Sequence, residues 1–120
     1  MAAVQVLVVE DDPGIGQMLE LALRERGIGV ARATTIPDAL RVASEVRPAL
    51  VLLDVRLDGL DGRAFAMAYA GRATCAIVVM TASEDAAEAA ASIGAEGHLS
   101  KPFDLDALYE MVGRYVPSPG

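Results

Sequence analysis

The chain of 120 residues contains no tryptophan, one cysteine, one histidine and only 4% aromatic residues. The single cysteine, Cys75, cannot form a disulfide within the chain, which fits a reducing compartment such as the cytoplasm. We expect Cys75 to be a small buried hydrophobic residue. One cysteine and one histidine, His98, also offer no ligand set of the kind that binds zinc. The composition therefore indicates neither a disulfide-stabilised protein nor a zinc protein.

Basic residues are also scarce, because 10 Lys and Arg stand against 17 Asp and Glu, a formal net charge of −7. Direct nucleic-acid binding normally requires a basic surface, so we do not expect it. No apolar run approaches the roughly 20 residues that cross a bilayer, and residues 1–4 lack the basic start of a signal peptide. Gly14 and Gly16 do not form a phosphate-binding glycine motif, so nucleotide binding is not expected either.

Apolar, β-branched runs alternate along the chain with segments of helical periodicity. The expected strands are residues 4–9, 29–33, 49–55, 75–80 and 97–100, and helices are expected after Asp12, after Thr35, over 63–70, over 85–93 and after Asp104. Strands that alternate with helices form a parallel sheet. The predicted fold is therefore α/β, a doubly wound five-stranded parallel sheet with helices on both faces. We expect it to occupy residues 1–116, with 117–120 as a tail or linker stub.

The first and last expected helices carry apolar residues at helical spacing. These are Ile15, Met18, Leu19, Ala22 and Leu23 in the first helix, and Leu105, Leu108, Tyr109 and Val112 on one face of the last. Gly27 and Gly94 are expected to end the first and fourth helices, and Pro48 limits the second.

Polar side chains gather where the apolar runs end. They are Glu10, Asp11 and Asp12 after the first run, Asp54 near the end of the third, Thr81 after the fourth and Lys101 after the fifth. Ligands of doubly wound sheets bind at the carboxyl ends of the strands. Crowded carboxylates repel unless a cation neutralises them, and Lys101 supplies one charge only. We therefore expect a divalent ion with oxygen ligands, magnesium or alternatively manganese. Asp12 precedes Pro13 and is more typical of a helix cap than of a ligand.

Asp54 is the candidate nucleophile of this cluster. It lies in the run Leu52-Leu53-Asp54-Val55, where an acid without a partner would be costly to bury. A carboxylate beside a metal ion and a lysine can attack phosphorus and form an aspartyl phosphate. The ion and Lys101 would neutralise charge on the transferring oxygens, and the Thr81 hydroxyl would hold another oxygen.

Taken together, these segments resemble the receiver domains of bacterial two-component systems, the flavodoxin-like domains of response regulators. The matching segments are residues 8–12, 52–55, 61–62, 80–82 and 100–103, and the resemblance extends from residue 4 to about 116. Each motif alone is weak, since Lys-Pro or Asp-Gly occurs in many proteins. Their order, each at the end of the appropriate strand, is a strong signal.

The resemblance implies a phosphorylation site with a magnesium ion. Asp54 would be the phosphoacceptor. Asp11 would bind magnesium directly and Glu10 through water, and the backbone carbonyl of Arg56 would be a further ligand. A sensor histidine kinase or a histidine phosphotransfer protein would donate the phosphoryl group from phosphohistidine.

The resemblance also implies a conformational switch. Thr81 would hydrogen-bond the phosphoryl group and follow it inward, Lys101 would pair with a phosphoryl oxygen, and Pro102 would follow Lys101 through a cis peptide bond. The resulting change near the last two helices would be read by a downstream protein that the sequence does not identify. Such a domain is a signalling switch and catalyses only its own phosphorylation and dephosphorylation.

Several positions depart from the family pattern. Asp58 stands where proline is usual, and the spans from Asp54 to Thr81 and from Thr81 to Lys101 are short. His98 stands where an aromatic switch residue is usual, which suggests that its protonation is coupled to phosphorylation. A receiver-like interaction module that works without phosphorylation is the alternative. A flavodoxin-like cofactor binder is a weaker one, because tryptophan and a hydroxyl-rich loop after the first strand are absent.

Overall fold

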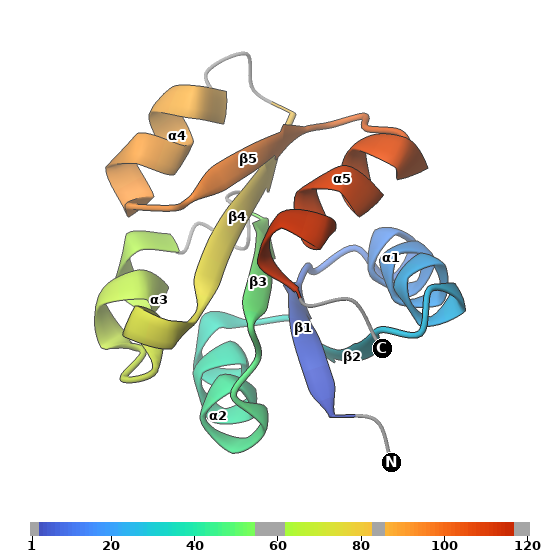
Figure 1. Ribbon diagram of the computed structural model, residues 1–120. Helices are drawn as coiled ribbons and strands as arrows, with labels where there is room; N and C mark the ends of the chain where they lie inside the picture. Colours follow the sequence, from blue (N-terminus) through green and yellow to red (C-terminus); the bar gives the residue numbers. More distant parts are fainter. Residues whose placement is uncertain (1–2, 55–61, 83–85, 117–120) are drawn as a thin grey trace.

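The computed structural model describes residues 3–54, 62–82 and 86–116, in which strands and helices alternate (Figure 1). The elements in chain order are β1 (Val4–Val9), α1 (Pro13–Glu25), β2 (Gly29–Ala33), α2 (Ile36–Val46), β3 (Leu50–Asp54), α3 (Gly62–Ala68), the 3-10 turn η2 (Arg72–Thr74), β4 (Ala76–Thr81), α4 (Ala86–Ile93), β5 (Gly97–Ser100) and α5 (Leu105–Tyr115). Within these ranges no helix is long and apolar enough to cross a membrane.

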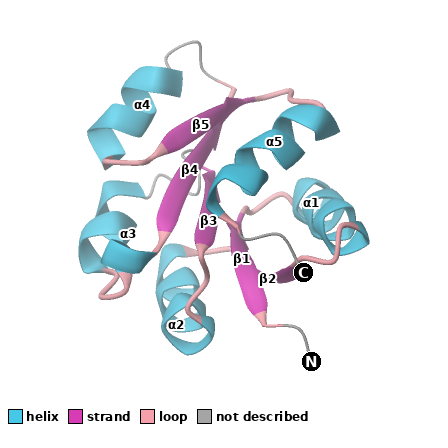
Figure 2. Ribbon diagram, in the orientation of Figure 1, coloured by secondary structure: helices cyan, strands magenta, loops and turns pink. Residues whose placement is uncertain are grey.

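The five strands form one parallel sheet in the order β2-β1-β3-β4-β5. Helices α1 and α5 cover one face, and α2, α3 and α4 cover the other (Figure 2). The chain first winds from β1 toward β2 and then continues from β3 on the other side of β1. In doubly wound sheets the carboxyl ends of the strands at such a reversal, here β1 and β3, are the usual place for a ligand. The predicted doubly wound fold is confirmed.

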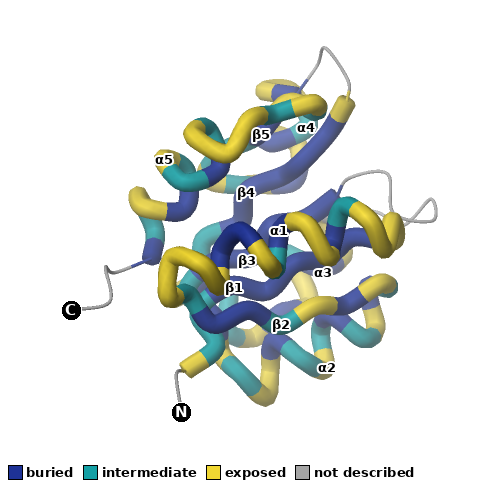
Figure 3. Tube along the Cα trace, turned by 90° about the vertical axis from the view of Figure 1, so that its right-hand side faces the viewer, coloured by how far each residue is buried: buried dark blue, intermediate teal, exposed yellow. Residues whose placement is uncertain are grey.

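Alternate residues of the central strands supply two separate hydrophobic cores. Val8 and Leu52 are paired across β1 and β3 and belong to the core beneath α1 and α5. Leu7 and Val51, paired next to them, belong to the core beneath α2, α3 and α4. Burial on both faces explains why these strands read as continuous apolar runs, and Figure 3 shows them as buried segments between partly exposed helices.

Three predicted helix caps are confirmed, and two of them hold the turns that follow β1 and β5. Asp12 Oδ1 accepts hydrogen bonds from the amides of Gly14 and Ile15, at 2.8 and 3.2 Å. Asp104 Oδ1 accepts one from the amide of Ala107 at 2.8 Å, and Thr35 caps α2 in the same way. Asp12 is thus a cap, as predicted, and Glu10 and Asp11 are the acids that remain at the sheet edge.

The helix ends agree with the sequence in two places. Gly27 and Gly94 adopt φ of 78° and 79°, the left-handed region that glycine enters without strain, just beyond α1 and α4.

Cys75 is buried, as expected, and burial raises the pKa of its thiol to about 11.

Four expectations need correction. β3 begins at Leu50, one residue later than predicted. β4 starts and ends one residue later than predicted, and Thr81 is its last residue because it pairs with Ser100 of β5. The helix predicted over 63–70 ends at Ala68 and is followed by the turn η2. Leu105, expected on one apolar face with Leu108, is 45% exposed in the first turn of α5.

Candidate functional site

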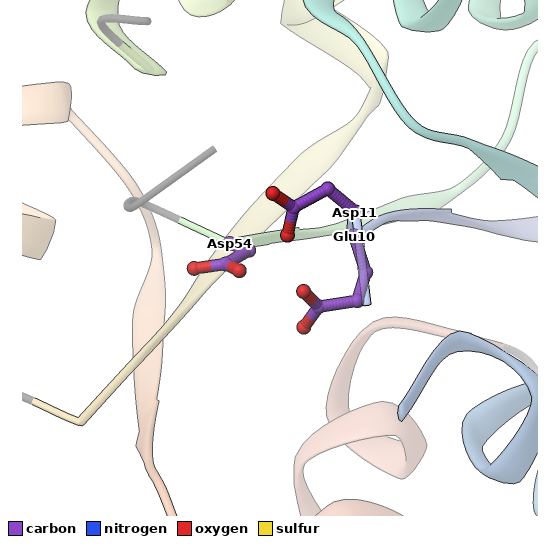
Figure 4. A group of neighbouring side chains, drawn as sticks. All are labelled: Glu10, Asp11 and Asp54. Atoms are coloured by element: carbon purple, nitrogen blue, oxygen red, sulfur yellow. The ribbon is translucent and has the colours of Figure 1, made fainter. Parts of the chain in front are cut away.

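Three carboxylates converge at the carboxyl ends of β1 and β3 (Figure 4). Glu10 and Asp11 directly follow β1, and Asp54 is the last residue of β3. Each of them offers an oxygen, and these oxygens all lie within 4.8 Å of one another. Glu10 and Asp54 are only 4% and 3% exposed, whereas Asp11 is exposed. The arrangement brings together the acids that the sequence predicted.

Backbone hydrogen bonds of the sheet fix two of these acids. The amide of Glu10 donates to the carbonyl of Ala33 at 3.1 Å, which continues the pairing of β1 with β2 by one residue. Asp54 is paired with Met80 of β4. The two buried carboxylates are therefore held by the sheet rather than by a loop.

Lys101 supplies a positive charge to the cluster. Its Nζ donates to Glu10 Oε1 at 2.7 Å and lies 3.5 Å from Asp54 Oδ2, and its side chain is 11% exposed. The amide of Lys101 donates to the carbonyl of Thr81 at 2.7 Å, so the pairing of β5 with β4 holds the lysine in place. The Lys101–Pro102 peptide bond is cis, as predicted.

One lysine does not balance three carboxylates. The pKa of Glu10 is raised to about 7, chiefly by burial and then by the neighbouring carboxylate of Asp54, while Lys101 opposes the rise. A site that raises the pKa of a carboxyl group in this way favours additional positive charge. Carboxylate oxygens at this spacing are the ligands that magnesium prefers, so the residues present fit the expected ion.

Thr81 and His98 lie on the same face of neighbouring strands. Thr81 is 1% exposed at the end of β4. His98, partly buried, is paired with Val79, which belongs to the core beneath α2, α3 and α4. Because side chains alternate along a strand and paired residues share a face, Thr81 and His98 both point to this side of the sheet. Arg56 and Asp58 lie outside the described residues.

The sequence did not predict an apolar groove beside the site. Its first part, about 330 Å³, is lined by Ile15, Met18, Ala82, Lys101, Pro102 and Phe103. A second part of about 370 Å³ shares Met18 and continues along α1 past Leu21 to Leu105. The available signal was Leu21, an apolar residue of α1 that lies outside the apolar stripe noted in the sequence. Helices α1 and α5, which are far apart in the chain, form this groove. The apolar periodicity within one helix does not show which other helix lies beside it.

A doubly wound sheet that gathers three carboxylates, a threonine and a lysine at the ends of its parallel strands defines a phosphoryl-accepting signalling domain. The family model of the response regulator receiver domain matches residues 6–113, and the chain belongs to this family. Receiver domains are phosphorylation-controlled switches of two-component systems that bind Mg²⁺ in the active site. They take phosphoryl groups from histidine kinases or phosphotransfer proteins.

The chain is similar to receivers of very different length. It is 30% identical over 116 residues to sporulation initiation phosphotransferase F of Bacillus subtilis and covers 94% of each protein. It is 34% identical over 110 residues to the transcriptional regulatory protein GlrR of Escherichia coli, matching 89% of this chain but only 25% of that protein. The receiver domain of a sensor histidine kinase from Pseudomonas aeruginosa, solved with magnesium coordinated in the active site cleft, has a TM-score of 0.80 at 29% identity, over 95% of this chain and 98% of that one.

The acid cluster predicts a magnesium-dependent gain in stability. A saturating ion should stabilise the native state by about 1–3 kcal/mol and raise the melting temperature by several degrees. Asp11→Ala should remove most of this response, because it deletes the exposed carboxylate of the cluster. Differential scanning fluorimetry with and without magnesium measures the shift.

The matched control for this measurement is Asp12→Ala. Loss of the cap should lower the melting temperature by itself, with a cost of about 1 kcal/mol, yet leave the magnesium-dependent shift in place. A full magnesium response in Asp11→Ala would rule out Asp11 as a ligand.

Proposed function

We propose that Asp54 accepts a phosphoryl group from the phosphohistidine of a histidine kinase or phosphotransfer protein. In this proposal Asp11 and Asp54 bind Mg²⁺ directly, Glu10 binds it through water, and the carbonyl of Arg56 completes the set. Manganese, which prefers the same oxygen ligands, is the alternative ion. The observation that carries the proposal is a 3% exposed carboxylate at the end of a central strand, 3.5 Å from a lysine and beside two further acids.

In the transfer step an Asp54 carboxylate oxygen attacks the phosphorus atom, and the bond from phosphorus to the donor imidazole nitrogen breaks. The electron pair of that bond stays on the imidazole. Magnesium, when bound, neutralises charge on the transferring oxygens. Lys101 is close enough to Asp54 to pair with an oxygen of the phosphoryl group. The hydroxyl of Thr81 donates a hydrogen bond to another oxygen of that group. In this proposal the same groups support hydrolysis of the aspartyl phosphate, and the chain catalyses only its own phosphorylation and dephosphorylation.

The groove along α1 suits a helix of the donor protein. Among the described residues, four large hydrophobic side chains are exposed, and three of them line this groove: Met18, Leu21 and Leu105. Glu25 also lines it, and the exposed acids Asp104 and Asp106 flank Leu105. An acidic rim around apolar residues favours an amphipathic helix with basic flanks. A second copy of this chain would bring like charges together.

Domain boundaries and location complete the proposal. In this proposal the receiver domain extends to residue 116, because α5 ends at Tyr115 and Val116 is still buried, while residues 117–120 lie outside the described residues. The free thiol of Cys75 agrees with a cytoplasmic location. The downstream partner is a protein that binds the phosphorylated form.

Asp54→Asn should abolish phosphoryl acceptance and leave the fold intact. Without magnesium the variant should be at least as stable as the wild type, because one of the crowded charges is gone. Intact mass after incubation with acetyl phosphate and magnesium measures acceptance. Phosphorylation of the variant to the wild-type level would refute the assignment. A wild-type chain that accepts no phosphoryl group would favour an interaction module that works without phosphorylation.

Leu21→Glu should slow transfer from a phosphorylated protein donor by about tenfold or more, because it places an acid in an apolar contact. The rate from acetyl phosphate, which needs no docked protein, serves as the internal reference. Met67→Glu is the matched control, since Met67 is the fourth exposed hydrophobic residue and lies on α3 outside the groove. Equal transfer rates for both variants would place the donor on another face.

The shared face of Thr81 and His98 supports coupling between phosphorylation and His98 protonation. An NMR pH titration of the single histidine, with and without beryllium fluoride and magnesium, measures the coupling. We expect the titration midpoint to differ between the two states, and one pH unit of difference corresponds to about 1.4 kcal/mol of bias on the switch. Identical midpoints and ring shifts would leave His98 as a passive residue of β5.

A further inference from the structure

The last turn of α4 is held by side chains from two other elements. Arg63 of α3 donates from Nε to the carbonyl of Ser92 at 2.9 Å. Arg72 of η2 donates from Nη2 to the carbonyl of Gly94 at 2.6 Å. Carbonyls at the end of a helix have no partner within the helix, and a guanidinium there also interacts favourably with the helix dipole. One arginine therefore binds a carbonyl of the last turn of α4, and the other binds the carbonyl of the residue just beyond it.

The backbone closes the same end of the helix. The amide of Ala95 donates to the carbonyl of Ala90 at 2.8 Å, and that of Gly94 to Ala91 at 3.2 Å, with Gly94 in the left-handed region. This is a Schellman-type ending, which fixes the direction in which the chain leaves the helix.

Arg72 ties this end to the start of β4. Its Nη1 also donates to the carbonyl of Cys75, and Nη2 pairs with Glu96 at 2.9 Å. Glu96 in turn accepts from the amide of Ile77 at 2.8 Å, and its own amide donates to the carbonyl of Ile77. The end of α4, the turn η2 and the first residues of β4 are thus one hydrogen-bonded unit.

Thr81 lies at the opposite end of β4. Six residues of strand separate the two ends by about 17 Å. From Thr81 the chain reaches Ala86, the first residue of α4, within five positions. A displacement of Thr81 therefore acts on the first turn of α4, while any movement of its last turn requires several charge-assisted hydrogen bonds to break.

We propose that Arg63 and Arg72 make the C-terminal end of α4 a fixed pivot. Phosphorylation then turns α4 about this end instead of shifting the whole helix, and the surface read by a partner changes most around the first turn of α4. This inference rests on the proposed function, because it needs Thr81 to respond to a phosphoryl group on Asp54.

The pivot is tested by amide chemical shifts in two-dimensional NMR, with and without beryllium fluoride and magnesium. In the wild type, changes over residues 86–89 should be at least threefold larger than over 92–96. In Arg72→Gln the changes should spread to 92–96, and Arg63→Gln should show a smaller effect in the same direction. Arg41→Gln is the matched control, because Arg41 is an exposed arginine of α2 that pairs only with Asp38 and Glu45 among the described residues. Equal changes at both ends of α4 in the wild type, or an unaltered pattern in Arg72→Gln, would overturn the pivot.

A second measurement separates this inference from the proposed function. In the unphosphorylated protein, Arg72→Gln should speed hydrogen exchange of the Gly94 and Ala95 amides about tenfold relative to Arg41→Gln. Unchanged exchange would show that the arginine does not hold the helix end, whatever the chemistry at Asp54. Faster exchange together with no wild-type response to beryllium fluoride would instead show that the phosphorylation switch has failed and, with it, the pivoting motion.

Discussion

The contact of Lys101 with Glu10 and Asp54 is the interaction on which the site depends. Two nearly buried carboxylates side by side repel each other and lose their hydration, and a buried ammonium group or a bound metal ion compensates for this. Lys101 lies closer to Glu10, at 2.7 Å, than to Asp54, at 3.5 Å. The stronger of the two contacts of Lys101 is thus the one with Glu10, the residue that follows β1.

Much of this arrangement follows from local sequence. β1, β2 and β5 have the predicted bounds, because a helix cap lies shortly after each strand (Asp12, Thr35 and Asp104) and limits where the strand can end. The positions of Glu10, Asp54 and Lys101 follow in turn, since parallel strands end at the same edge. Asp12 could be assigned to the cap because proline stands directly after it.

Other features could not be predicted, because they arise between segments distant in sequence. Met18 of α1 and Leu105 of α5 fit the apolar pattern of core residues. Each is nevertheless at least 40% exposed, because both line the groove between these two helices. No local sequence pattern marks Arg63 and Arg72, and the carbonyls that they bind at the end of α4 lie more than twenty residues away. The 3-10 turn η2, which contains Arg72, is another feature that the sequence did not predict. The role of His98 is still a prediction.

The short helices α3 and α4 bear on this difference between local and distant contacts. They contain seven and eight residues, too few to be stable in isolation. Their order must come from tertiary contacts such as those made by Arg63 and Arg72. Strand pairing, in contrast, holds Glu10, Asp54, Thr81 and Lys101, and their positions do not depend on the length of these helices. Substitutions on the outer surface of α3 and α4 should therefore be tolerated without a change in the geometry of the acid cluster, because the helices and the cluster depend on different contacts.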